Sequence, residues 1–172
     1  MKPRLLQAYM RTAETFAELS HAKRLHVGAI VVKADRIISI GYNGMPAGWD
    51  NNCEQKEYPD RYDKHPEWAD LKFPLQEPDG TYYRLKTRPE VLHAESNAIS
   101  KLARSSESGD GATMFITHAP CMECSKLIYQ SGIRRVYFGS AYRDDAGVQF
   151  LKSCGIAVEQ MERGPDGKAA DC

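Results

Sequence analysis

Hydrophobic residues in the first quarter of the chain follow two different spacings. Between residues 4 and 19 they recur every three or four positions with charged residues between them, which predicts an amphipathic helix that covers a core. The apolar run 27–32 predicts a buried strand, and the run 37–42 predicts its hairpin partner after a short turn. Residues 43–48 hold two glycines and a proline, which predicts a shaped loop where the second strand ends.

The second half of the chain alternates between helical and strand patterns. Helices are predicted over 91–104, 121–131 and 147–153, and strands over 112–117, 135–139 and 156–161. A hairpin followed by this alternation predicts an α/β fold: a three-layer α/β/α sandwich around a five-stranded mixed sheet, antiparallel hairpin first and parallel strands after it. We expect a single domain over 1–162 and a polar, frayed tail over 163–172.

Residues 49–90 differ in composition from the rest of the chain. They hold five of the nine prolines, 17 charged residues between 50 and 90, one glycine and no serine. A flexible linker would be rich in glycine and serine, so we expect an insertion into the domain instead. Two interpretations stay open: an ordered insertion that packs on the domain through its aromatic residues, or a solvated excursion from the surface.

Composition and charge argue against several classes of partner. The 172 residues include 23 basic and 23 acidic ones, and this balance argues against a nucleic-acid partner. No apolar run approaches the ~20 residues that span a bilayer, and the N-terminus lacks the apolar core of a signal peptide. Five cysteines, an odd number, fit a reducing compartment better than a disulfide framework. We therefore expect a cytoplasmic protein with no membrane partner.

Candidate metal ligands concentrate at two predicted helix starts. His93 and Glu95 stand at the first, and Pro120 precedes Cys121 and Cys124 at the second. The two cysteines share one face of a helical turn, and a helix N-terminus lowers the pKa of a thiol. One imidazole and two thiolates are the three protein ligands of a catalytic zinc, which keeps its fourth position for water. Glu95 projects elsewhere on its turn and can exchange protons with that water.

Each part of this pattern is weak when taken alone. A C-x-x-C pair is as typical of structural zinc as of redox chemistry, and an isolated H-x-E usually has no function. A structural zinc site would need a fourth cysteine or histidine, which stands near neither segment. The complete pattern, H-A-E and P-C-x-x-C with a strand between two helix starts, is the signature of zinc deaminases.

Three segments resemble one branch of these enzymes. The sequence GYNGMPAG at 41–48, LHAESNAI at 92–99 and APCMECSKLI at 119–128 resemble motifs of the deoxycytidylate (dCMP) deaminases in the cytidine deaminase superfamily. The chain departs from these motifs at Ser96, where leucine is frequent, and at Ser125, where alanine is usual; neither change touches the chemistry. The resemblance runs from about residue 27 to 161, with 49–90 divergent.

This resemblance implies hydrolysis of dCMP to dUMP and ammonia, feeding dTMP synthesis. One catalytic Zn²⁺ per subunit would be held by His93, Cys121 and Cys124, and Glu95 would carry protons to N3 and the leaving amine. The implied substrate contacts are Asn43 to the deoxyribose, the Ala94 N–H and a carbonyl near Thr117 and His118 to the base edge, and Tyr142 packed on the base. The candidates for the phosphate are Ser20, His21, Lys23, Arg24 and Arg143.

The resemblance also implies regulation. In the family a nucleoside triphosphate with Mg²⁺ sits at the glycine-rich loop, dCTP activating and dTTP inhibiting. Here the corresponding residues are Gly41, Tyr42, Asn43, Gly44, Pro46 and Gly48. Glycines let backbone N–H groups approach a ligand closely. Such regulation accompanies homohexamers in the family.

Alternatives remain at two levels. A second, structural zinc is the less favoured interpretation, because His21, His26, Cys53 and His65 show no matching ligand spacing. The substrate could instead be deoxycytidine, dCTP, or a cytosine or adenosine in a polynucleotide. A zinc-stabilised nucleotide sensor without catalysis is a different class, and the intact Glu95 argues against it because a sensor needs no proton shuttle.

Overall fold

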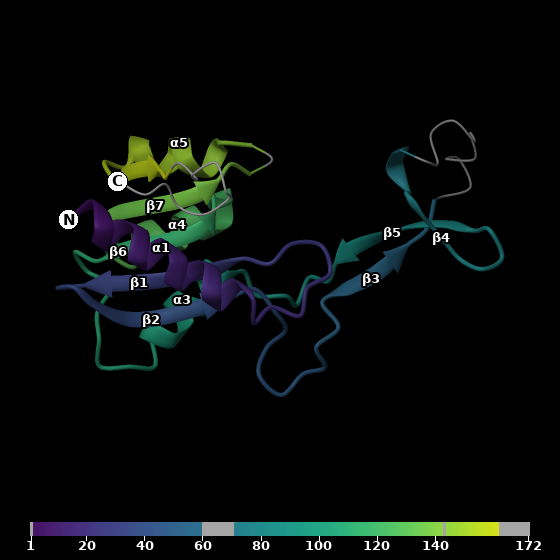
Figure 1. Ribbon diagram of the computed structural model, residues 1–172, viewed down its shortest axis with the longest axis horizontal. Coiled ribbons are helices and arrows are strands. Elements are labelled where there is room, and N and C mark those ends of the chain that lie inside the picture. The colour runs from purple at the N-terminus through teal and green to yellow at the C-terminus, as the bar shows by residue number, and fades with distance from the viewer. Residues whose placement is uncertain (1, 60–70, 143, 162–172) are drawn as a thin grey trace.

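The computed structural model describes residues 2–59, 71–142 and 144–161 (Figure 1). The first elements are α1 (Pro3–Ala17), β1 (Gly28–Lys33), β2 (Arg36–Tyr42), β3 (Glu54–Glu57), β4 (Leu75–Gln76) and β5 (Tyr82–Thr87). They are followed by α3 (Ala94–Leu102), β6 (Thr113–His118), α4 (Met122–Gln130), β7 (Arg135–Ser140), α5 (Ala146–Ser153) and β8 (Ala157–Gln160). All five predicted strands of the main sheet are thus confirmed as β1, β2, β6, β7 and β8. The helix predicted to begin at residue 91 begins three residues later, at Ala94.

The main sheet has five strands in the order β2-β1-β6-β7-β8. Strand β1 pairs antiparallel with both β2 and β6, and β6, β7 and β8 run parallel. The predicted mixed sheet, antiparallel hairpin first and parallel strands after it, is confirmed.

Helices cover both faces of this sheet. Because successive side chains of a strand point to opposite faces, Ala29 and Val31 of β1 pack in one cluster with residues of α3, α4 and α5. Ile30 and Val32 point the other way and pack with Tyr9 of α1. The result is the predicted three-layer α/β/α sandwich, with α1 on one face and α3, α4 and α5 on the other (Figure 1).

Strand β2 lies unusually close to α3, the helix that begins after His93. A Cβ atom built on Gly41 would stand 2.1 Å from the Ala94 carbonyl oxygen and 2.6 Å from the Ala98 nitrogen. Any side chain at Gly41 would therefore push the helix away from the sheet. This glycine sets the position of the helix start that carries the predicted ligand.

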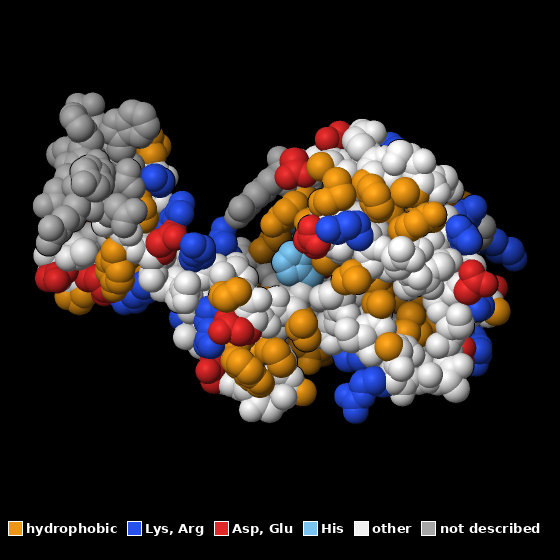
Figure 2. All heavy atoms as spheres, turned by 180° about the vertical axis from the view of Figure 1, so that it is seen from behind, with side chains coloured by type: hydrophobic (Ala, Val, Ile, Leu, Met, Phe, Trp, Pro, Cys, Tyr) orange, Lys and Arg blue, Asp and Glu red, His pale blue; other side chains and the backbone are white. Residues whose placement is uncertain are grey.

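Residues of the 49–90 segment form a second, three-stranded antiparallel sheet in the order β3-β5-β4. It extends away from the sandwich, as both views show (Figures 1 and 2). Exposed ion pairs cross it, including Glu57 with Arg84 and with Lys86. At its base, Cys53 and Glu54 are buried. The segment therefore has an exposed outer part and a buried inner end.

Two further predictions concern the C-terminal tail and membrane-spanning helices. The tail predicted over 163–172 lies outside the described residues. Within the described ranges, every helix is too short or too polar to cross a bilayer.

Candidate active site

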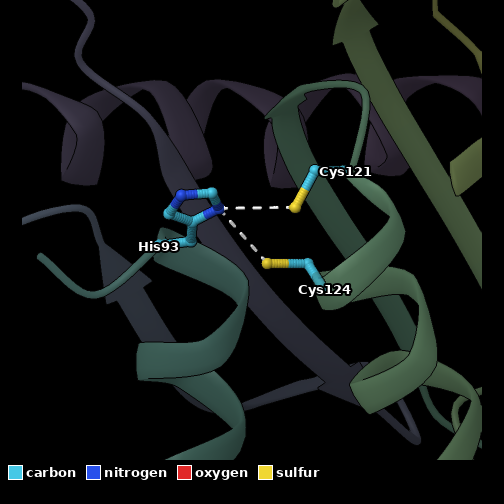
Figure 3. A group of neighbouring side chains, drawn as sticks. All are labelled: His93, Cys121 and Cys124. Carbon is cyan, nitrogen blue, oxygen red and sulfur yellow. Dashed lines mark hydrogen bonds between the residues drawn. The ribbon is translucent and has the colours of Figure 1, made fainter. Parts of the chain in front are cut away.

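The predicted metal ligands meet at the starts of two neighbouring helices. His93 is the N-cap residue of α3, and Cys121 is the N-cap residue of α4. Cys124 lies in the first turn of α4, where the i, i+3 spacing puts it on the same side as Cys121. The three side chains point toward one another from the two helices (Figure 3).

The separations in this cluster fit a zinc ion. His93 Nδ1 lies 3.6 Å from the Cys121 Sγ and 3.4 Å from the Cys124 Sγ. Zinc–sulfur bonds of about 2.3 Å and zinc–nitrogen bonds of about 2.0 Å, arranged as a tetrahedron, place nitrogen and sulfur about 3.5 Å apart. The donor set, one imidazole and two thiols, is also one that zinc prefers. His93, Cys121 and Cys124 are therefore able to hold the ion without rearrangement.

Hydrogen bonds within the cluster already favour one thiolate. The Cys124 thiol and the His93 ring, both bonded to Cys121, lower the pKa of the Cys121 thiol to about 3. The same bond to Cys121, together with burial, raises the pKa of the Cys124 thiol. The bond to Cys121 raises the pKa of His93. The three groups thus share protons that a bound metal ion would displace.

Glu95 lies in the first turn of α3 beside this cluster. Only 4% of the residue is exposed. Burial raises the pKa of its carboxyl group to about 6. A buried carboxyl group next to a metal site, with a pKa raised toward neutrality, is suited to take up and release a proton.

A cavity of about 450 Å³ connects this cluster with other segments of the chain. His93, Glu95 and Cys121 line it, and so do polar residues from elsewhere: Arg24, Asn43, Glu54 and Thr87. Its volume is in the range of sites that bind small molecules. The cavity therefore has a metal end and a separate polar wall.

Five of the predicted substrate contacts line this cavity: Arg24, Asn43, Ala94, His118 and Tyr142. The Ala94 N–H belongs to the first helical turn, where a helix offers no acceptor of its own. The Asn43 side chain accepts a hydrogen bond from the Val27 N–H and donates one to the Leu25 carbonyl oxygen, both at 2.8 Å. Asn43 thus holds the neighbouring loop and keeps one donor and one acceptor position for a ligand.

Four other predicted contacts do not line the cavity: Ser20, His21, Lys23 and Thr117. The Ser20 hydroxyl donates to the Asn43 carbonyl oxygen at 2.8 Å, and the buried Thr117 hydroxyl accepts from the Gly28 N–H at 3.2 Å. The Lys23 backbone N–H donates to Glu54. Ser20, Lys23 and Thr117 thus support the cavity wall. Arg143 lies outside the described residues.

The glycine-rich loop 41–48 is tied to the metal site by backbone hydrogen bonds. The Gly44 N–H donates to the Leu92 carbonyl oxygen at 3.1 Å, and the Leu92 N–H donates back at 2.9 Å. The sequence predicts that N–H groups of this loop approach a ligand, but the Gly44 N–H already donates to another residue. Gly48 has a φ of +87°, a conformation that favours glycine. Pro46 accepts a turn hydrogen bond from Trp49.

Of the residues considered for a second zinc, those that the structure describes (His21, His26 and Cys53) form no group of metal ligands. Among the described ranges, the cluster of His93, Cys121 and Cys124 is the one group of three metal-ligating side chains. His26 is bonded to the Ala22 carbonyl oxygen at 2.7 Å, and the Cys53 thiol contacts the Asn51 carbonyl oxygen. His65 lies outside the described residues.

Sequence reasoning missed two polar residues of the cavity wall, Glu54 and Thr87. They are register partners on β3 and β5, and both contact the segment that carries Arg24. The Arg24 guanidinium donates to the Thr87 hydroxyl at 3.2 Å. Neither residue stands in a motif, and both lie in a charge-rich segment where a buried acidic residue has no local signal.

An α/β/α sandwich with a three-ligand zinc site at two helix starts defines the class of this protein. The family model of the cytidine and deoxycytidylate deaminase zinc-binding region matches residues 3–140, and the chain belongs to this family. The deoxycytidylate deaminase of Enterobacteria phage T4 is 36% identical over 148 residues, which cover 77% of this chain and 77% of that protein. The ComE operon protein 2 of Bacillus subtilis is 32% identical over 161 residues, 91% and 70% of the two chains.

A solved structure of a related protein has a similar fold. The dCMP deaminase of the cyanophage S-TIM5, in complex with dCMP and dUMP, is 42% identical to this chain. The match has a TM-score of 0.73 and covers 94% of this chain and 99% of that one.

Proposed function

We propose that this protein hydrolyses dCMP to dUMP and ammonia. The observation that carries the proposal is the joint position of the zinc ligands and the buried Glu95 at one end of a cavity. Further support comes from relatives that are named deoxycytidylate deaminases and from a similar structure that holds dCMP and dUMP.

Zinc, when bound, supplies a Lewis acid that makes water nucleophilic near neutral pH. His93, Cys121 and Cys124 would hold the ion, and the two thiolates would balance its charge. Glu95 takes a proton from the attacking water, passes it to N3 of the cytosine and then helps to protonate the leaving amine. The products are the uracil base of dUMP and ammonia, so atoms balance with one water consumed.

The cavity wall would position the substrate. The Ala94 N–H, at the start of α3, would donate to the base, and Tyr142, which lines the same cavity, would pack on it. Asn43 stands further along, beside the loop that carries Arg24. The Arg24 guanidinium, oriented by Thr87, is the cation that we assign to the 5′ phosphate.

Regulation by dCTP and dTTP with Mg²⁺, and assembly into a homohexamer, are part of the proposal. Support for them is the resemblance of the 41–48 loop to the family's effector loop. The paired hydrogen bonds between Gly44 and Leu92 connect this loop physically with the metal site, because Leu92 directly precedes His93. The free cysteines Cys53, Cys121, Cys124 and Cys154 are consistent with the cytoplasmic location that we expect.

Ammonia release from dCMP, dCTP, deoxycytidine and CMP, measured side by side with zinc content, tests the proposal. We expect one zinc per chain and a kcat/KM for dCMP about 10²-fold or more above that for deoxycytidine, because an empty phosphate site forfeits a charge-assisted contact. Equal efficiency for dCMP and deoxycytidine would make the protein a nucleoside deaminase. Zinc binding without release of ammonia from any of the four would favour a nucleotide sensor.

A further inference from the structure

Glu54 is a buried acidic residue that the zinc chemistry does not use. It is the first residue of β3, only 4% exposed, and it lines the cavity. Its two carboxylate oxygens have different surroundings. Oε1 accepts hydrogen bonds from the Lys23 N–H at 2.9 Å and the Arg24 N–H at 3.3 Å. Oε2 is buried and has no hydrogen-bond partner within the described part of the chain.

A buried carboxylate oxygen without a partner needs a hydrogen-bond donor. Leaving such an atom without a hydrogen bond is destabilising, so it needs a donor from outside the chain, such as a ligand or a water. Glu54 lines the cavity, so its carboxylate belongs to the wall against which a bound molecule would rest. The bonded oxygen, at the same time, fixes the carboxylate in one orientation against the backbone of residues 23 and 24.

We propose that Glu54 is a specificity-determining residue whose Oε2 accepts a hydrogen bond from the 3′-hydroxyl of the substrate's deoxyribose. This inference rests on the proposed function, because it takes dCMP as the ligand. The donors on dCMP are the 4-amino group and the 3′-hydroxyl. The amino group belongs at the zinc ligands and Glu95, and the phosphate is an anion that a carboxylate repels.

Neighbouring contacts place Glu54 where a sugar would lie. Glu54 bonds the backbone of Lys23 and Arg24, and Asn43 bonds that of Leu25 and Val27. The two side chains therefore hold consecutive parts of one loop, and both line the cavity. Glu54 also pairs in register with Thr87, which orients the Arg24 guanidinium. Sugar and phosphate would thus be met by adjoining residues.

The test compares dCMP with 2′,3′-dideoxycytidine 5′-monophosphate, which lacks only the 3′-hydroxyl. For the wild-type protein we expect kcat/KM to favour dCMP by about 10²-fold or more, because a site that bonds a hydroxyl rejects analogues without it. Glu54→Ala should reduce this preference to about tenfold or less. Glu54→Gln keeps an oxygen for Lys23 and Arg24 and offers an amide N–H₂ to the hydroxyl, so its preference should be intermediate.

The partly buried Glu57 on the same strand supplies the matched control. Glu57→Gln should keep the full preference, because its partners Arg84 and Lys86 lie outside the cavity. A merely structural role for Glu54 would lower kcat/KM for both nucleotides equally, and an unchanged ratio in both Glu54 variants would overturn the proposal. Should Glu54→Ala fail to fold, the ratio for Glu54→Gln decides. A wild-type protein that releases no ammonia from dCMP would instead overturn the proposed function itself.

Discussion

The α/β/α sandwich and the three-stranded sheet of residues 54–87 both contribute residues to the cavity, but different interactions hold the two regions in place. The sandwich brings its ligands from two helix starts whose positions are set by a core of fully buried residues such as Ala98 and Met114. The three-stranded sheet is crossed by exposed ion pairs and contacts the cavity at its inner end, through Glu54 and Thr87. The chemistry and the proposed selection of substrate therefore depend on parts of the chain that can be perturbed separately.

Removing a ligand from the sandwich should have the largest effect. We expect Cys124→Ala to lose nearly all zinc and to reduce dCMP turnover by about 10³-fold or more, because two remaining ligands do not complete a catalytic site. Metal analysis and ammonia release measure both. The matched control is Cys154→Ala, a partly buried cysteine that packs beside the core and should keep both zinc and turnover. Zinc retained by Cys124→Ala would contradict the ligand assignment.

A change at the boundary between the two regions should alter selection and leave the chemistry intact. Arg24→Gln removes the proposed phosphate contact, so kcat/KM for dCMP should fall by about 10- to 10²-fold while that for deoxycytidine stays the same. The exposed Arg36→Gln, which breaks an ion pair with Glu107, is the control and should change neither value. Equal losses on both substrates would show that Arg24 acts on the fold instead of the phosphate.

Two glycines of one motif should differ in their effect on stability. Gly41→Ala forces a Cβ atom to 2.1 Å from the Ala94 carbonyl oxygen, whereas a Cβ atom at Gly44 meets nothing within 4 Å. We expect the first change to lower the free energy of unfolding by about 1–3 kcal/mol and the second to stay within about 0.5 kcal/mol. Urea unfolding curves measure both. Similar losses for the two would mean that the packing of β2 on α3 does not depend on Gly41.

The smallest effect should come from the outer part of the three-stranded sheet. Hydrogen bonds from Lys86 and Arg84 lower the pKa of Glu57 from 4.5 to about 2. A depressed carboxyl pKa contributes stability above pH 4.5 that is lost as the pH falls toward 2. Glu57→Gln should therefore lower Tm slightly at pH 7, less at pH 3 and less in high salt, since exposed pairs are screened. A Tm difference independent of pH would contradict this account of the pairs.

Local patterns predicted the sandwich because each of its elements has its own signal. The hydrophobic spacing of residues 4–19 predicted the helix α1, and the motif spacing placed His93, Cys121 and Cys124 at helix starts. These features need no knowledge of distant contacts, and the predicted ligands do meet.

The rest depends on contacts between residues far apart in the chain. Strand β3, with the sequence EQKE, has no alternation of apolar residues, and it forms through pairing with β5. Glu54 is buried because its carboxylate bonds the backbone of residues about 30 positions earlier. The Gly44 N–H is occupied by Leu92, nearly 50 positions later. No motif or periodicity reports such partners.

The central claim is that the two helix starts form a zinc site with Glu95 as its proton carrier. Zinc content and dCMP turnover, both measured in one preparation of Glu95→Gln, test this claim most directly. Glutamine keeps the shape of the side chain and cannot take up the proton. We expect one zinc per chain, as in the wild-type protein, and a kcat lower by about 10²-fold or more. The exposed Glu123→Gln on the first turn of α4 is the control and should match the wild type in both. Near-wild-type turnover with Glu95→Gln would contradict the account.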